Sequence, residues 1–157
     1  AAGVGYAARL RALAAGLEDV PVPRVAVHGD LTMHNVLLDR GSLAIIDWEA
    51  ARVSGLPLAD LEYAAVDAVA AADRYRDRPG AWDRCFGSEH AVAALLRSHR
   101  YRLVTELGVP AAYAELCHHL VWLEHAANEQ RRAGAAEDRP FLRIVRKLAE
   151  NEGAAGA

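Results

Sequence analysis

Apolar residues near the start of the chain recur at helical spacing. Leu10, Leu13 and Leu17 would share one face of a helix, so about residues 4–18 are predicted to form an amphipathic helix. The Pro-Val-Pro sequence at 21–23 ends this segment, because proline lacks the amide hydrogen that a helix interior needs.

Three short apolar runs come next, and each predicts a β-strand: residues 25–27, 35–38 and 43–46. The turn between the last two runs contains Gly41, which readily adopts the positive φ of tight hairpin turns. We therefore expect a β-hairpin whose open end carries Asn35 and Asp47.

The chain after Pro57 has the pattern of a helical protein, and Pro57 itself suits the first turn of a helix that reaches about Val69. The charged stretch 74–87 contains Pro-Gly and is predicted to be a loop or a frayed helix end. Further helices are expected over about 88–107, which Ser88 would cap, 110–132, which Gly134 would end, and 139–151, which Asp138 would cap.

A small β-hairpin region followed by about four helices indicates a mostly helical α+β protein. The length of 157 residues suits one domain or one lobe of a larger fold. No apolar stretch approaches the roughly 20 residues of a membrane span, and the N-terminus lacks the pattern of a secretory signal. We therefore expect a cytoplasmic protein without a membrane partner.

The charge pattern adds little to this picture. The net charge is −3 and the two signs are interspersed, so no nucleic-acid partner is expected. All but one of the 18 basic residues are arginine, and the single lysine is Lys147. Cys85 and Cys117 are far apart in sequence, and we interpret them as buried thiols.

A polar segment, residues 28–35, lies between two predicted strands, and Asp47 follows the third. Oxygen-bearing side chains are thus carried to strand ends, where loops converge. Because Mg²⁺ prefers oxygen ligands and shares them with substrate phosphates, Asn35 and Asp47 are candidate magnesium ligands. Asp30, five residues before Asn35, could accept the proton of an incoming hydroxyl group.

The sequences HGDLTMHNVLLD at 28–39 and LAIIDWEAA at 43–51 resemble the signature of the aminoglycoside phosphotransferase and choline kinase-like family. The resemblance implies a protein-kinase-like fold, of which residues 1–152 would form the C-terminal, catalytic lobe. It also implies transfer of a phosphoryl group from ATP to a hydroxyl of a small molecule, such as an aminoglycoside, another sugar or an amino alcohol. Asp30 would be the catalytic base. Asn35 and Asp47 would be the ligands of a Mg²⁺ ion that assists the transfer. Residues 153–157 are expected to be a disordered tail.

The same resemblance suggests supporting roles for other residues. His28 would brace the loop instead of transferring protons. The sequence GLPLADL at 55–61 resembles a further family motif, in which Asp60 would bond the loop backbone from beneath. His34 and Glu49 could contact substrate or phosphate; the alternatives are a solvent-facing loop residue and a turn cap. Acidic residues of a later helix could line an acceptor pocket, or be ordinary surface carboxylates: Glu115, Glu124 and Glu129.

Kinases also need an N-terminal lobe with a glycine-rich loop and a strand lysine over the phosphates. Only 27 residues precede His28 and none resembles such a loop, so we expect this lobe to be missing. The chain could be a fragment, a lobe completed by a partner chain, or a pseudokinase-like binding module without catalysis. In each case the chain alone should be a poor kinase. A metal-dependent phosphoesterase is disfavoured, because His34 falls at the wrong spacing from Asp30.

Overall fold

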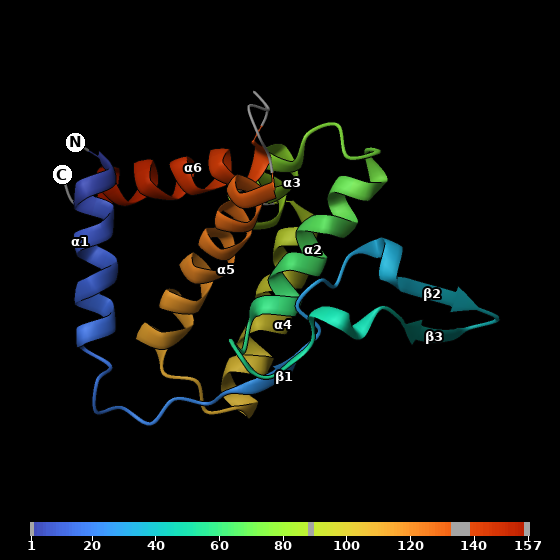
Figure 1. Ribbon diagram of the computed structural model, residues 1–157, viewed down its shortest axis with the longest axis horizontal. Coiled ribbons are helices and arrows are strands. Elements are labelled where there is room, and N and C mark those ends of the chain that lie inside the picture. The colour runs from blue at the N-terminus through green and yellow to red at the C-terminus, as the bar shows by residue number, and fades with distance from the viewer. Residues whose placement is uncertain (1, 88–89, 133–138, 156–157) are drawn as a thin grey trace.

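The computed structural model describes residues 2–87, 90–132 and 139–155. A β-hairpin projects from one side of a group of packed helices, and the start of α1 lies near the end of α6 on the other side (Figure 1). The helices are α1 (Ala2–Ala15), α2 (Ala59–Ala72), α3 (Arg78–Phe86), α4 (Ala91–Glu106), α5 (Ala111–Arg132) and α6 (Pro140–Ala155). The mostly helical α+β architecture predicted from the sequence is confirmed.

The strands form two separate antiparallel pairs. The predicted hairpin is present: β2 (Val36–Asp39) pairs with β3 (Ser42–Ile45), in a register that sets Val36 opposite Ile45. The two turn residues between them, Arg40 and Gly41, both have positive φ. β1 (Val25–Val27) pairs with β4 (Arg52–Gly55), a strand that the apolar pattern did not predict.

The ends of the hairpin differ from the prediction. Asn35 belongs to a short 3-10 turn, Met33–Asn35, and Ile46 lies after β3. A second 3-10 turn, Trp48–Ala50, follows Asp47. The hairpin therefore ends one residue earlier on each side, and this leaves Asn35 and Asp47 in irregular backbone.

The prediction of a loop over residues 74–87 is wrong, because α3 occupies most of it. The Asp77 carboxylate accepts a hydrogen bond from the backbone N–H of Gly80 at 2.9 Å and caps the helix. Pro79 lies in the first turn, where its missing N–H has no partner to lose.

Other helix ends also shift. α4 begins at Ala91, where the side chain of His90 is the cap, and the predicted cap Ser88 lies outside the described residues, as do Gly134 and Asp138. α2 begins at Ala59 and not at Pro57. α6 continues to Ala155, so the expected disordered tail is helical up to that residue, and the last two residues lie outside the described part.

The core lies where α2, α3, α5 and α6 meet. Trp122 and Ile144 are fully buried at its centre, together with Val66 of α2. A second cluster around Leu58 and Cys117 lies next to the start of α2. Cys85 and Cys117 are both buried free thiols, as predicted, and burial raises the pKa of each to about 11.

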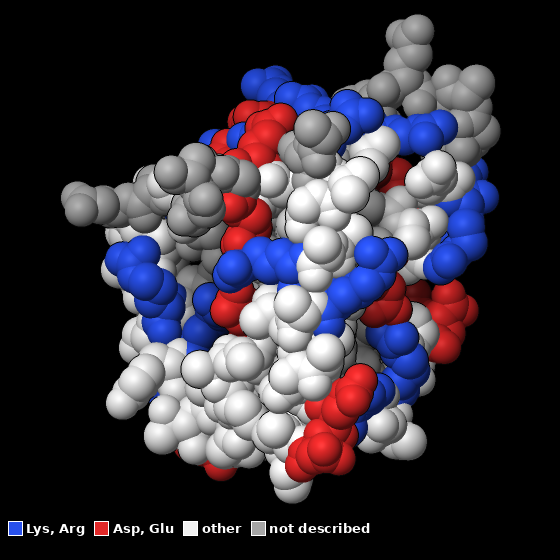
Figure 2. All heavy atoms as spheres, turned by 90° about the vertical axis from the view of Figure 1, so that its left-hand side faces the viewer, with Lys and Arg blue, Asp and Glu red and all other residues white. Residues whose placement is uncertain are grey.

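Charged side chains of both signs are interspersed over the face that carries α1 (Figure 2). Within the described ranges, none of the helices combines the length and the apolar character needed to cross a lipid bilayer.

Candidate active site

The polar loop 28–35 is shaped by backbone geometry at Gly29. Its φ is +81°, a conformation that favours glycine. A side-chain carbon at this position would lie 2.5 Å from the carbonyl oxygen of Ala50. The loop and the turn after Asp47 are therefore in direct contact through a residue without a side chain.

Two carboxylates on α2, one partly and one fully buried, hold the loop from beneath. Asp60, expected to support the loop, accepts hydrogen bonds from the backbone N–H groups of His28 at 2.6 Å and Gly29 at 3.0 Å. Asp67, two helical turns further on, accepts one from the N–H of Met33 at 2.7 Å. Asp67 is fully buried and forms an ion pair with Arg78 at 3.0 Å.

The ring of His28 is buried and fully engaged. Its Nδ1 accepts a hydrogen bond from the N–H of Asp30 at 3.3 Å, and its Nε2 lies 2.9 Å from the carbonyl oxygen of Ile46. These two contacts fix the tautomer with hydrogen on Nε2. The indole of Trp48 packs against the ring, with centroids 4.8 Å apart. The histidine thus joins the loop to the end of the hairpin.

Asn35 is buried and connects the three candidate residues through the backbone. Its Nδ2 donates to the carbonyl oxygen of Asp30 at 2.9 Å. Its own carbonyl oxygen accepts from the N–H of Ile46, the residue before Asp47, at 3.0 Å. Within the described part of the chain, no hydrogen bond involves the amide oxygen Oδ1 of Asn35.

Asp47 has a left-handed backbone, with φ 62° and ψ 60°, although it is not glycine. Residues in such uncommon conformations cluster at functional sites. The left-handed turn ends the strand direction of β3 and starts the 3-10 turn, and the Asp47 carboxylate borders a cavity.

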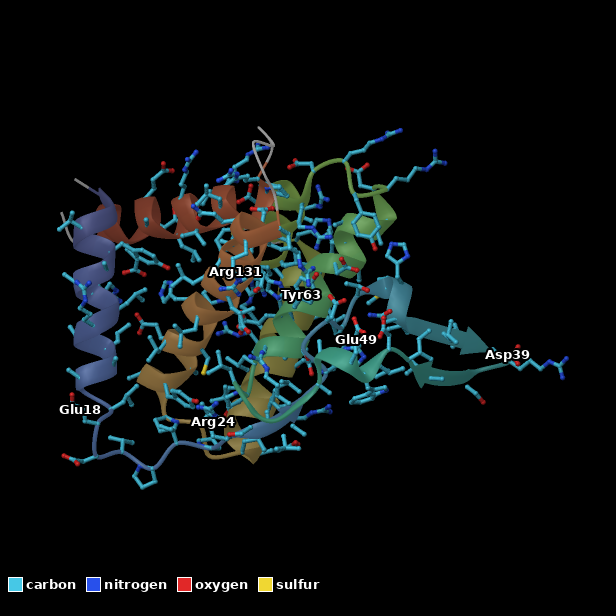
Figure 3. The ribbon with its side chains drawn as sticks, in the orientation of Figure 1. Glu18, Arg24, Asp39, Glu49, Tyr63 and Arg131 are labelled. Atoms are coloured by element: carbon cyan, nitrogen blue, oxygen red, sulfur yellow. The ribbon has the colours of Figure 1, made fainter. Side chains whose placement is uncertain are left out.

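One cavity of about 450 Å³ brings Asp30, Asp47 and Glu49 together. Its other wall comes from α2, α5 and α6. Glu49 lies at the base of the hairpin, and Tyr63 of α2 lies on the helical side (Figure 3). The remaining lining residues are Gly29, Ala50, Arg52, Glu124, His125, Asn128, Glu129, Arg132 and Phe141.

Aromatic rings form the helical wall of this cavity. His125 stacks on Tyr63, with centroids 3.8 Å apart, and on Phe141 at 5.1 Å. Burial lowers the pKa of His125 to about 4, so the ring is neutral near pH 7. Burial is also the main reason that the pKa of Tyr63 rises to about 12, with a smaller contribution from the charge of Asp30.

Of the other candidate residues, some line this cavity and others lie elsewhere. His34 lies outside the cavity lining and stacks on Tyr75, with centroids 5.5 Å apart. Glu124 and Glu129 line the cavity, whereas Glu115 borders a different one. Glu124 forms an ion pair with Arg52 at 2.8 Å, and Glu129 accepts hydrogen bonds from the first N–H groups of α6.

Asp67 was not identified from the sequence as a support of the loop, nor Arg52 as a lining residue of the cavity. A signal for Asp67 was available, because it lies on the face of α2 that also carries Tyr63, Val66 and Ala70. An acidic residue on a buried helix face requires a partner. No comparable signal marked Arg52, which reaches the cavity only through the unpredicted strand β4.

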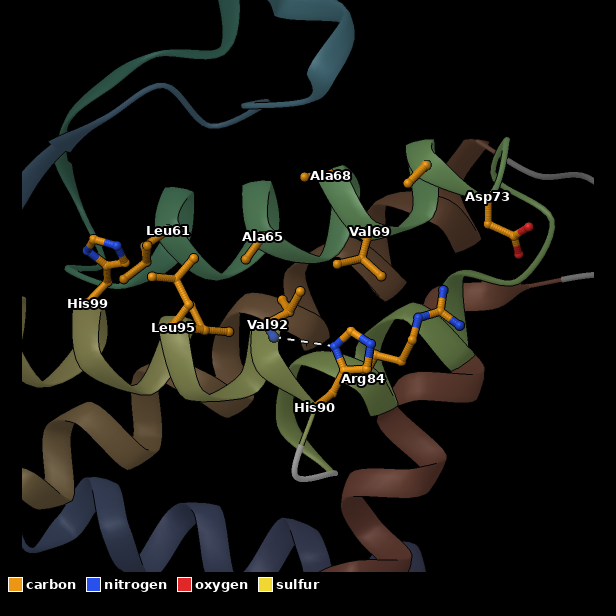
Figure 4. A pocket seen from close by; sticks show the side chains of 12 residues that line it. Leu61, Ala65, Ala68, Val69, Asp73, Arg84, His90, Val92, Leu95 and His99 are labelled. Carbon is orange, nitrogen blue, oxygen red and sulfur yellow. Dashed lines mark hydrogen bonds between the residues drawn. The ribbon is translucent and has the colours of Figure 1, made fainter.

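A separate cavity of about 760 Å³ lies between α2 and α4 and is lined mainly by apolar side chains (Figure 4). Leu61, Ala65 and Val69 of α2 face Val92 and Leu95 of α4 there. It shares no lining residue with the cavity of Asp30 and Asp47.

Comparison with known proteins identifies a family whose model covers the polar loop. A model of the phosphotransferase enzyme family matches residues 3–93, more than half of the chain, including the polar loop and the hairpin. No curated protein and no solved structure matches the chain. The fold and this match define a phosphotransferase with a protein-kinase-like fold. The chain belongs to the phosphotransferase enzyme family, which confirms the resemblance found in the sequence.

Proposed function

We propose that this chain is the catalytic lobe of an ATP-dependent kinase that phosphorylates a hydroxyl group of a small molecule. The observation that carries the proposal is that Asp30 and Asp47 line the same cavity. Asn35 does not line this cavity, but it is hydrogen-bonded to the backbone of Asp30 and of Ile46, the residue before Asp47. A base and an oxygen ligand on one cavity, with a second oxygen ligand on the same loops, match what phosphoryl transfer requires from this part of a kinase.

In the proposed reaction, the oxygen of the acceptor hydroxyl forms a bond to the γ-phosphorus of ATP. The bond from that phosphorus to the β–γ bridging oxygen breaks, ADP leaves, and the hydroxyl proton passes to the Asp30 carboxylate. The Asp47 carboxylate and the Oδ1 of Asn35 would hold Mg²⁺, since both are oxygen donors and Oδ1 has no hydrogen bond within the described residues. Bound Mg²⁺ supplies charge neutralisation on the phosphates.

Other residues would position this machinery. Asp60 and Asp67 fix the loop backbone, and the two engaged nitrogens of His28 leave it no free site for proton transfer. Glu49 borders the cavity and is assigned to the acceptor or metal side. His34 lies outside the cavity and stacks on Tyr75, so it has no role in the proposed reaction.

The acceptor would bind against α5 and α6. Five carboxylates and two arginines border the cavity, so its balance is acidic and favours an acceptor that carries an amino group, as in an aminoglycoside or amino alcohol. The hydroxyl groups of a sugar could bond the Asn128 amide.

The part that clamps ATP would come from an N-terminal lobe or a partner chain. The only lysine, Lys147, forms an ion pair with Asp83 between α6 and α3, and it does not line the cavity of Asp30. The isolated chain should therefore turn over well below the roughly 1 s⁻¹ that is the low end for kinases. This same observation supports a second candidate, a pseudokinase-like lobe that binds without catalysis.

The metal half of the proposal can be tested on the chain alone. We expect Mn²⁺, a probe for the Mg²⁺ site, to bind in calorimetric titration, and Asp47→Asn to weaken binding by about 10-fold or more. Asp30→Asn, at the base, should change Mn²⁺ affinity less. Asp39→Asn, at the exposed hairpin tip, is the matched control. Equal affinity in wild type and Asp47→Asn would refute the assignment.

The two candidate functions differ in one measurement. Adding ATP with Mg²⁺ and a panel of hydroxyl acceptors to the protein supplied with an N-terminal lobe should give phosphorylated product, which Asp30→Asn removes. ATP binding with no product under those conditions would favour the pseudokinase-like module.

A further inference from the structure

Three potential metal ligands converge at a cavity of about 620 Å³ that shares no lining residue with the cavity of Asp30. Glu115 and His119 are one helical turn apart on α5, and Glu152 comes from α6. One ligand atom from each residue lies within 4.8 Å of the others. Nε2 of His119 lies 3.8 Å from a carboxylate oxygen of Glu152.

The imidazole of His119 is held in place by α1. Its side chain is 3% exposed, and its Nδ1 lies 3.0 Å from the hydroxyl oxygen of Tyr6. When Nδ1–H donates to that oxygen, the lone pair of Nε2 points toward the carboxylates. Metal-binding histidines are commonly fixed through their second nitrogen in this way.

The carboxylates of this cluster already accommodate a cation. The two carboxylates already share one positive charge, because the guanidinium of Arg9 forms ion pairs with both Glu115 and Glu152. Arg9 is 47% exposed, so its side chain has room to leave the carboxylates.

We propose that Glu115, His119 and Glu152 bind a divalent transition metal ion of the zinc type, with the guanidinium of Arg9 as the competing internal cation. One nitrogen and two carboxylate ligands leave a fourth position open to the cavity, as in zinc sites with three protein ligands. Zinc bonds of about 2.0–2.2 Å require the ligand atoms to approach by about 1 Å from their present spacing. Rotation of the two glutamate side chains supplies that movement once Arg9 has left.

The test is titration of the chain with ZnCl₂, followed by calorimetry and by the shift in melting temperature. We expect saturable binding of one zinc ion at this cluster. Glu115→Gln and Glu152→Gln should each weaken it by about 10- to 100-fold, and Tyr6→Phe by about 10-fold. Arg9→Gln should tighten zinc binding by about 3- to 10-fold, because two exposed ion pairs no longer compete.

Arg9→Gln separates this proposal from a purely structural role of the cluster. If the cluster only docks α1, Arg9→Gln lowers the melting temperature and zinc does not restore it. Co²⁺ offers a second readout, since a tetrahedral site with these ligands gives visible absorption bands that Glu152→Gln should abolish. His99→Gln, which changes an exposed histidine on α4, is a control that should leave zinc affinity unchanged. Zinc affinity that is unchanged in both Glu115→Gln and Glu152→Gln would overturn the proposal.

Discussion

Gly29 and Gly41 have nearly the same backbone conformation, with φ values of 81° and 83°, but different surroundings. A side-chain carbon on Gly29 would collide with the carbonyl oxygen of Ala50, whereas one on Gly41 would have no neighbour within 4 Å. Substitution of each glycine by alanine therefore distinguishes two contributions to the free energy of unfolding: the strain of a left-handed backbone, which both positions share, and steric overlap, which occurs only at Gly29.

We expect Gly41→Ala to lower the free energy of unfolding by about 1 kcal/mol, the cost of a left-handed backbone. Gly29→Ala should lower it by about 2–4 kcal/mol, because overlap with Ala50 adds to that cost. Urea unfolding of both variants measures the difference. Equal losses would show that the loop accommodates the methyl group.

Asp67 provides a second prediction at this scale. Asp67→Asn removes the charge that pairs with Arg78 and should lower the free energy of unfolding by about 3 kcal/mol, as expected for a buried pair that loses one partner. The control is Asp83→Asn, which removes a partly exposed pair with Lys147 and should cost less than about 1 kcal/mol. Losses of similar size in the two variants would contradict the role assigned to Asp67.

The candidate site residues could be named from the sequence because a base and oxygen ligands have chemical types that spacing can reveal. Asp30, Asn35 and Asp47 are of this kind. The residues that hold them in place could be found only in part. Asp60 belongs to a motif, but Asp67 acts through its burial and through Arg78, eleven positions away, and such a contact requires the fold.

At the scale of elements, α3 shows how a local sequence can be misread. Pro79-Gly80 suggested a break, yet the same residues start a helix because Asp77 accepts the N–H of Gly80. β4 shows the opposite case, an element that its own sequence does not predict. Its sequence, Arg-Val-Ser-Gly, has no apolar run, and it is a strand only because β1 lies beside it.

The cap of α3 can be tested directly. Asp77→Ala should lower the free energy of unfolding by about 1 kcal/mol, the usual value for loss of an N-cap side chain. Asp77→Asn retains an acceptor oxygen and should recover most of the loss. Chemical denaturation measures both, and an unchanged midpoint for Asp77→Ala would mean that the cap contributes nothing to the stability of α3.

At the scale of the whole molecule, buried neutral histidines couple stability to pH. His125 and His119 each have a pKa near 4 in the folded chain, against about 6.5 when unfolded. Between these values the unfolded chain binds more protons, so the free energy of unfolding must fall as the pH drops from about 6.5 to about 4.

His125→Phe tests this coupling, because phenylalanine preserves the stack between Tyr63 and Phe141 and cannot be protonated. We expect a smaller loss of stability on acidification than in wild type, measured by urea unfolding at pH 7 and pH 4.5. His99→Gln, at an exposed position, should not change the slope. If His125→Phe leaves the difference in free energy of unfolding between pH 7 and pH 4.5 unchanged, His125 is excluded as a source of the acid sensitivity.

The projecting hairpin also has a consequence for how the protein behaves in concentrated solution. Leu37, Leu38 and Leu43 are at least half exposed on a two-stranded ribbon whose outer edges have no strand partner within the described residues. Such edges pair readily with edges of other chains. The charged tip, Asp39 and Arg40, opposes end-to-end contact but not sideways contact. Colloidal stability should therefore depend on this ribbon: light scattering should rise with protein concentration, and Leu38→Lys should suppress the rise.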